Sequence, residues 1–242
     1  MAGAAGLAAG CADDNSSLFI YGVQYPVPPG CFLIADPTQR MLDYGYLDLA
    51  IRSNYIAWLL VGNQLTPRGA KLNTRTETMQ VSLSGAEVQL TDSQGNALAD
   101  KFSVYGSGFA TPSKSETPGL GLFAAQLIPD PIGQKFKDPS FGVVGTTTLK
   151  QVIAKVRVFG QTTGNQDVES AELSFPISVC YGCLISYPVS SLSADGTQCV
   201  ANATTGGGGQ VVSCNVGQDD IIPCTLCAAT LDVCKNVPKQ TP

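Results

Sequence analysis

The 242-residue chain has a net charge of −5, and only 14% of its residues are charged, against about 25% in ordinary soluble domains. Its 14 basic residues are scattered, which argues against a nucleic-acid partner because phosphates need clustered Lys and Arg. Histidine is absent, so the chain lacks the commonest general base and metal ligand and every histidine-activated nucleophile. We therefore expect no cofactor.

The N-terminal residues place small side chains directly before a cysteine. Residues 7–11 read LAAGC, and a short polar stretch, residues 13–17, follows Cys11. The pattern resembles the lipobox of bacterial lipoproteins, in which that cysteine is lipidated and becomes the mature N-terminus. It departs from the pattern in having no Lys or Arg and an apolar stretch shorter than the ~7–15 residues of an export signal. The general character of the whole sequence also resembles that of uncharacterised exported lipoproteins of bacteria such as the myxobacteria.

The cysteine count agrees with that resemblance. Nine cysteines in one chain favour an oxidising compartment, and removal of Cys11 leaves an even number that can pair completely. The alternative is that Cys11 forms a disulfide and another thiol stays free. Apart from the N-terminus, the longest apolar run is residues 55–61, too short for the ~18 residues of a membrane span. We expect an exported protein, lipid-anchored at the outer membrane or cell surface, or else secreted.

Residues 18–179 alternate short apolar runs with turn residues, which predicts an all-β domain after a tether of residues 1–17. Residues 47–51 alternate as in a half-buried strand, and residues 55–61 form a continuous apolar run expected in a central strand. Residues 86–105 read as a hairpin around the turn 92–96. The turn carboxylates are also potential calcium ligands, but they lack EF-hand spacing, and backbone turn chemistry explains them.

The second half of this region contains the clearest strand pair. After one apolar segment at residues 120–128, residues 152–158 and 171–179 alternate with a loop between them, and Pro176 faces outward, as on an edge strand or bulge. The pattern predicts an antiparallel β-sandwich of the immunoglobulin or fibronectin type, with a jelly roll as the alternative. The predicted core comprises Leu49, Trp58, Leu60, Val81, Val88, Val156, Leu173, Phe175 and Ile177.

Residues 180–242 hold seven of the nine cysteines and predict a small disulfide-stapled module with a glycine-rich loop tip at residues 206–209. Asp219 and Asp220 before Pro223 predict a helix start, with three cysteines on one helical face. Thiols on one face do not readily bridge each other, so we expect them to bond upstream cysteines, and Cys31 to bond the one left over. The expected disulfide cysteines are Cys31, Cys180, Cys183, Cys199, Cys214, Cys224, Cys227 and Cys234.

Two C-x-x-C pairs, at residues 180–183 and 224–227, invite a zinc or redox interpretation. Their separation of 40 residues exceeds the ~15–20 of a zinc ribbon, and a thioredoxin-like site needs an α/β fold that is absent here. We therefore interpret both pairs as structural disulfides, with no metal site.

Three functions remain open. The first is a non-enzymatic envelope lipoprotein with a structural, adhesive or assembly role, whose partners are the membrane and other envelope proteins. The second is a glycan-binding module that uses aromatic loop residues, namely Tyr21, Tyr25, Tyr44 and Phe141. The third is a hydrolase that works with two carboxylates. Its scattered candidate acids are Asp43, Asp48, Glu87, Asp130 and Asp138.

Overall fold

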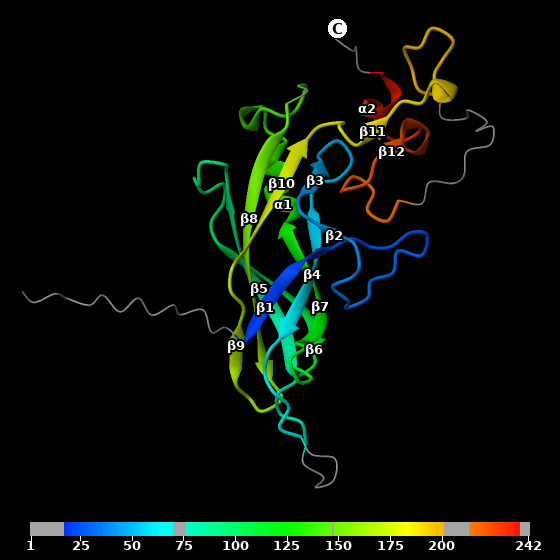
Figure 1. Cartoon of the computed structure of the whole chain (residues 1–242). Helices are drawn as coiled ribbons and strands as arrows, with labels where there is room; N and C mark the ends of the chain where they lie inside the picture. Colours follow the sequence, from blue (N-terminus) through cyan, green and yellow to red (C-terminus); the bar gives the residue numbers. More distant parts are fainter. Residues whose placement is uncertain (1–16, 70–75, 147, 201–212, 238–242) are drawn as a thin grey trace, which may run out of the picture.

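Two β-sheets pack face to face in the computed structural model, which describes residues 17–69, 76–146, 148–200 and 213–237 (Figure 1). The first sheet has the order β2 (Met41–Leu42), β1 (Leu18–Gln24), β4 (Tyr55–Asn63) and β7 (Gly119–Ile128). The second has the order β3 (Gly45–Asp48), β10 (Leu173–Cys180), β8 (Lys150–Thr162), β5 (Val81–Thr91) and β6 (Phe102–Ala110), and β9 (Asp167–Glu169) also pairs with β8. The predicted all-β sandwich is confirmed.

The strand pairs are antiparallel within the sandwich, with one exception. β3 runs parallel to β10, and its pairing begins only at Ile177. Pro176 therefore lies where one side of β10 is still an open edge, in agreement with the outward edge position expected for it. The predicted hairpin is confirmed by the pairing of β5 with β6, and Asp92 closes its turn by accepting the backbone N–H groups of Gln94 and Asn96.

The core lies between the sheets and follows the alternation of the strands. In β8 the buried apolar side chains are those of Val152, Ala154, Val156 and Val158. The predicted core residues are buried except Trp58 and Leu173, which are only half-buried. The prediction of Trp58 as a core residue is wrong, because a continuous apolar run does not show which residues face inward, and Ala57 and Leu59 do so instead.

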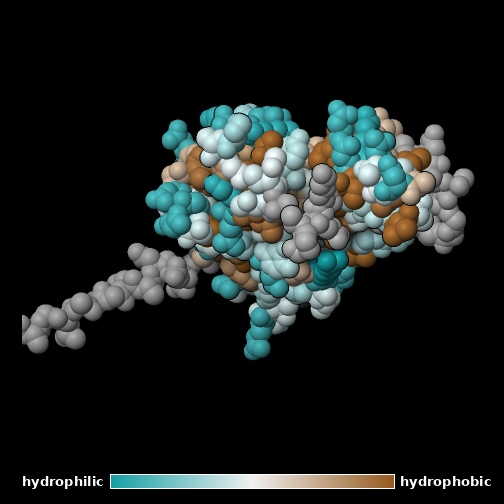
Figure 2. All heavy atoms as spheres, turned by 90° about the horizontal axis from the view of Figure 1, so that it is seen from above, coloured by the Kyte–Doolittle hydropathy of each residue, from teal (hydrophilic) through white to brown (hydrophobic). Residues whose placement is uncertain are grey.

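Short helices and the C-terminal module complete the described structure. The remaining elements are α1 (Asp130–Phe136), η2 (Pro139–Phe141), β11 (Ile185–Ser186), η3 (Val189–Ser191), β12 (Ile222–Pro223), η4 (Cys224–Leu226) and α2 (Asp232–Lys235). The module has its own apolar cluster and lies at the end of the sandwich opposite β9 (Figure 1). In Figure 2, apolar and hydrophilic side chains are interspersed on that end of the molecule. Within the part of the chain that the structure describes, none of the helices has the length and apolarity that crossing a bilayer requires.

The described cysteines form four disulfides in or at the module, and two of these differ from the expected pattern. Cys31 bonds Cys214, which ties the module to the loop after β1, and Cys199 bonds Cys224. The expectation that the downstream cysteines bond only upstream ones is wrong, because Cys227 bonds Cys234 and the remaining bridge joins Cys180 to Cys183.

The expected continuous helix after Pro223 is also absent, which explains the unexpected bridge. The η4 turn ends at Leu226, and Leu231 is extended, with φ −124° and ψ 124°. The chain starts a new helix, α2, only at Asp232. The break turns Cys234 back toward Cys227, so the two cysteines do not share one helical face.

Replacement of Phe175 by Ala tests the register of β10. Phe175 is buried between the sheets, whereas Ser174 is exposed on the opposite face. We expect Phe175→Ala to lower the free energy of unfolding by roughly 3–5 kcal/mol and Ser174→Ala to change it by less than about 0.5 kcal/mol, as measured by urea denaturation. Similar losses at both positions would contradict the register.

Candidate functional site

A hollow of about 700 Å³ opens on the outer face of the six-stranded sheet, over β5, β8 and β9. It lies on the far side of these strands from the core. Its lining comprises Ser82, Ser84, Phe159, Gly160, Gln161, Thr162, Thr163, Asp167, Val168 and Glu169. Hydroxyl, amide and carboxylate groups therefore surround one aromatic ring.

Strand register builds the hollow from two neighbouring rows of residues. In the first row, Ser82 of β5 pairs with Gln161 of β8, which pairs with Asp167 of β9. Directly paired residues of antiparallel strands point to the same face, so these three polar side chains lie together. The Gln161 amide donates a 3.1 Å hydrogen bond to Asp167 Oδ1, which holds the two side chains side by side.

The second row supplies the aromatic floor. Gly85 of β5 pairs with Phe159, and Phe159 pairs with Glu169. A Cβ atom at Gly85 would lie 2.3 Å from Cζ of Phe159, so the missing side chain is what lets the ring lie over β5. On the other side Gly85 pairs with Tyr105 of β6, whose ring packs edge-on against Phe159 with centroids 6.2 Å apart. Tyr105 is 80% exposed and lies outside the lining of the hollow, whereas Phe159, which lines it, is half-buried.

A β-bulge sets the position of the second row. The register of β5 shifts between Leu83 and Gly85. Against β8 this leaves Ser84 as the extra residue, whereas against β6 the extra residue lies on β6, between Tyr105 and Gly108. Bulges re-aim side chains in this way near functional surfaces. Because of the shift, Ser82, Ser84 and Gly85 all contribute to the outer face, and an unbroken alternation would not predict this arrangement.

The remainder of this sheet face carries ion pairs. Lys101 lies 2.6 Å from Glu87, and Glu172 lies within 4.0 Å of both Lys155 and Arg157. These charges neutralise one another at the surface. The outer face is thus divided into a charged zone and the aromatic and carboxylate hollow.

None of the four aromatic residues proposed from the sequence lines this hollow. Tyr25 is buried and donates a hydrogen bond to Asp220, and Phe141 stacks on Phe136. Tyr21 packs against Phe19, and Tyr44 lines a separate hollow of about 240 Å³. The structure does not gather these residues into one binding surface.

The candidate acids of a hydrolase are also dispersed, and most have structural partners. Asp48 is fully buried among backbone N–H groups, and Glu87 pairs with Lys101. Asp130 accepts a 2.7 Å hydrogen bond from the Ser53 hydroxyl, and Asp138 caps the start of η2. Asp43 lines the smaller hollow. The carboxylates of the large hollow, Asp167 and Glu169, extend from one strand side by side, so they do not face each other across a cleft as glycosidase carboxylates do.

Asp219 and Asp220 do not start a helix but fasten the module to the sandwich. Asp219 accepts hydrogen bonds from the Tyr46 backbone N–H at 2.7 Å and the Tyr55 hydroxyl at 2.8 Å. Burial raises the pKa of the Asp219 carboxyl, while burial and the Asp219 carboxylate together raise the pKa of the Tyr55 hydroxyl well above its usual value. Burial and the bond to Asp220 raise the pKa of Tyr25 to about 12.

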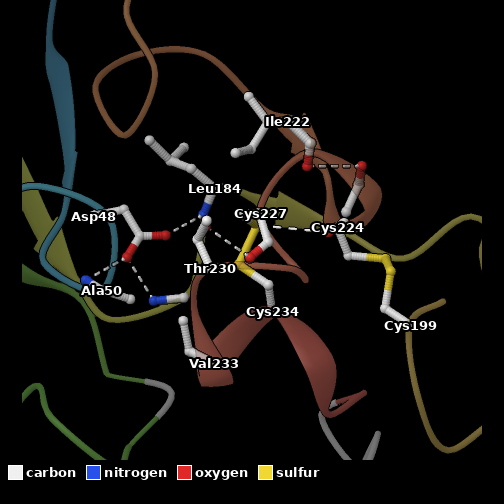
Figure 3. The surroundings of a disulfide bond; sticks show 12 residues. Asp48, Ala50, Leu184, Cys199, Ile222, Cys224, Cys227, Thr230, Val233 and Cys234 are labelled. Atoms are coloured by element: carbon white, nitrogen blue, oxygen red, sulfur yellow. Dashed lines mark hydrogen bonds between the residues drawn. A yellow bond between two sulfur atoms is a disulfide. The ribbon is translucent and has the colours of Figure 1, made fainter. Parts of the chain in front are cut away.

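The first C-x-x-C pair lies beside a buried carboxylate. Asp48 accepts the backbone N–H groups of Ala50, Gly182 and Leu184 at 3.0, 2.6 and 2.9 Å (Figure 3). Among the described residues, Asp48, Cys180 and Cys183 form a group whose potential ligand atoms lie within 4.8 Å of one another. Both sulfur atoms are bonded to each other, so this group offers a metal only the carboxylate.

Two sequence features lie outside the described residues, namely the lipobox cysteine Cys11 and the glycine run 206–209. Comparison with known protein families and with curated protein sequences finds no match to this chain. The candidate site is therefore interpreted from its geometry alone.

The raised pKa of Asp219 predicts a pH effect on stability. Between the ordinary pKa of 3.8 and the raised value, the folded protein keeps a proton that the unfolded chain has released. The Asp219 contribution to the free energy of unfolding must then fall as pH rises through this window. We expect urea denaturation from pH 3.5 upward to show wild type losing stability relative to Asp219→Asn. If the stability of wild type relative to Asp219→Asn stayed constant or rose with pH, the burial of this carboxyl would be contradicted.

Proposed function

We propose that this chain is an exported binding module that takes a glycan in the hollow over β5, β8 and β9. The observation that carries the proposal is the half-buried Phe159 ring in the hollow, beside the amide and carboxylate of Gln161 and Asp167, with the exposed Tyr105 ring packed edge-on against it. A sugar ring has an apolar face and a polar rim. An aromatic ring packs against the apolar face, while amide and carboxylate groups bond the hydroxyls.

The dimensions and rigidity of the hollow support the proposal. Its volume of about 700 Å³ lies within the ~300–1,000 Å³ of small-ligand sites. The aromatic and amide side chains come from β8, which at Phe159 and Gln161 is paired on both sides, by β5 and β9. Such a site needs little ordering when the ligand binds, which favours affinity.

The charges in the hollow select the class of glycan. Asp167 and Glu169 are both exposed there, and the chain as a whole carries a net charge of −5. Anionic sugars would meet like charges, whereas neutral or N-acetylated sugars offer hydroxyl and amide donors to the carboxylates. We therefore propose a neutral or N-acetylated oligosaccharide as the ligand.

Export is supported by the four disulfides, which persist in oxidising compartments outside the cytosol.

We further propose that a lipid on Cys11 anchors the protein to the bacterial envelope. Leu18, at the start of β1, bridges Ser170, which directly follows Glu169 of the hollow. Seven residues extend at most about 25 Å, so the anchor would keep this end of the sandwich near the membrane. We propose that glycan binding at this position serves an adhesive role at the envelope.

Removal of the Phe159 ring tests the glycan site. We expect wild type to bind soluble chito- or cello-oligosaccharides in isothermal titration and Phe159→Ala to bind about tenfold more weakly, a loss of ~1.4 kcal/mol. Tyr44→Ala is the matched control, because it removes an exposed ring from the smaller hollow and should bind like wild type. Equal weakening in both variants, or binding only to an anionic polysaccharide such as polygalacturonate, would contradict the proposal.

Lipidation is tested separately. Expressed in a bacterial host behind a complete export signal, the protein should begin with a diacylglycerol-modified Cys11 in intact-mass analysis and fractionate with membranes. Cys11→Ser should abolish both properties. An unmodified wild-type chain that retains residues 1–10 in the soluble fraction would contradict the lipid anchor. It would not affect the glycan site, which the binding experiment tests separately.

A further inference from the structure

One of the four disulfides is unlike the others in its exposure. The Cys180–Cys183 bridge joins a buried residue, Cys180, which is 2% exposed, to an exposed one, Cys183. Among the described cysteines Cys183 alone is exposed; both members of the Cys199–Cys224 and Cys227–Cys234 bridges are buried. Access to sulfur is a condition for thiol–disulfide exchange, so these bridges should differ in reactivity.

The same bridge adds little to stability through chain entropy. It closes a ring between residues three apart in sequence, whereas the bridge from Cys31 to Cys214 spans 183 residues. The stabilisation that a crosslink gives by restricting the unfolded chain grows with the length of the closed loop, so it is smallest for a short ring. Stabilisation of the fold therefore explains this disulfide less well than it explains the others.

The turn that carries the bridge is held by other interactions. The buried Asp48 carboxylate binds the backbone N–H groups of Gly182 and Leu184, and Gly182 adopts a positive φ of 81° that suits glycine. Cys180 is the last residue of β10 and pairs with Asp48 of β3. These contacts do not involve the sulfur atoms, so the turn can keep its shape when the S–S bond opens. Asp48 is in this sense a positioning residue.

A hollow gives access to the exposed sulfur. It has a volume of about 400 Å³, and Cys180 and Cys183 lie in its wall together with Tyr181, Tyr187 and Val233. The Tyr187 hydroxyl donates a 2.9 Å bond to the Val233 carbonyl, which closes one side. Aromatic and aliphatic groups next to a reactive sulfur suit the side chains that flank a cysteine in an extended peptide.

We propose that Cys180–Cys183 is a thiol–disulfide exchange site that oxidises the thiols of a peptide or an unfolded protein. The peptide thiolate attacks Sγ of Cys183, so a mixed disulfide forms while the Cys180–Cys183 bond breaks and its electron pair leaves on Sγ of Cys180. A second peptide thiolate then attacks the peptide sulfur of the mixed disulfide and releases Cys183. Two electrons pass from two substrate thiols to the protein disulfide, and the two protons that they lose end on Cys180 and Cys183.

This inference does not depend on glycan binding. The exchange site lies in the turn after β10, at the module end of the sandwich, while the glycan hollow lies over β9 at the other end (Figure 1). If the experiments contradict glycan binding, the thiol–disulfide exchange site is unaffected, and the reverse also holds.

The first test compares bridges within the folded wild-type protein. The full chain is incubated with reduced glutathione, a peptide thiol, without denaturant, and free thiols are alkylated over time and located by peptide mapping. We expect Cys180 and Cys183 to become labelled at least about tenfold faster than Cys227 and Cys234, while near-ultraviolet circular dichroism stays unchanged. The bridge of Cys227 to Cys234 is the matched control, because it also closes a short loop but has both members buried. Equal rates, or labelling only as the fold is lost, would overturn the proposal.

The second test identifies the attacked sulfur. Cys180→Ser removes the leaving sulfur and should accumulate one glutathione adduct, on Cys183, when incubated with oxidised glutathione. Cys183→Ser leaves only the buried Cys180 thiol and should acquire the adduct at least about tenfold more slowly. Equal or reversed rates in two variants with native circular dichroism would overturn the assignment. If either variant does not fold, the wild-type comparison of the two bridges decides the proposal.

Discussion

The antiparallel pairing of β5 with β8 is the constraint on which both the core and the candidate glycan site depend. These are the two longest strands described, and each presents a buried row to the other sheet and a second row to solvent. The inward row supplies residues such as Val88 and Val156, and the outward row supplies Ser82, Phe159 and Gln161. A shift of one residue would exchange the two rows, so burial of the core also fixes the chemistry of the outer face.

The C-terminal module depends on the sandwich for its attachment, because its own apolar cluster is small. Gln218 occupies the β-bulge between Tyr55 and Ile56, where its amide bonds both the N–H and the carbonyl of Ile56. Asp219 and Asp220 add bonds to tyrosine hydroxyls from the sandwich. Burial of Asp219 costs free energy, which the bridge from Cys31 to Cys214 helps to offset by restricting the unfolded chain.

The sequence predicts the strands where apolar and polar residues alternate, and it fails where another rule decides. Alternation correctly predicts that Phe175 and Val156 face the core, whereas the continuous apolar run around Trp58 does not show which of its residues face inward. The α1 helix was missed, although Asp130 and Pro131 are typical of a first helical turn. In the candidate site, Phe159 and Gln161 continue the alternation of β8. Their partners on β5, Gly85 and Ser82, cannot be predicted from this alternation, because the pairing depends on a β-bulge and on the register of strands that are distant in sequence. The disulfide between Cys227 and Cys234 depends on the interruption of the helix at Leu231, which the helical periodicity of the sequence does not predict.

The central claim is that the outer face of β5, β8 and β9 binds glycan and that the surface around Tyr25 and Tyr44 does not. Mapping of backbone amide chemical shifts during titration with a chito-oligosaccharide tests this claim most directly, since every described segment reports at once. We predict that shifts concentrate at residues 82–85, 159–163 and 167–169 and that the amides around Tyr25 and Tyr44 stay unchanged. Shifts that concentrate around Tyr25 and Tyr44 instead, or none at ligand concentrations of several millimolar, would contradict the account.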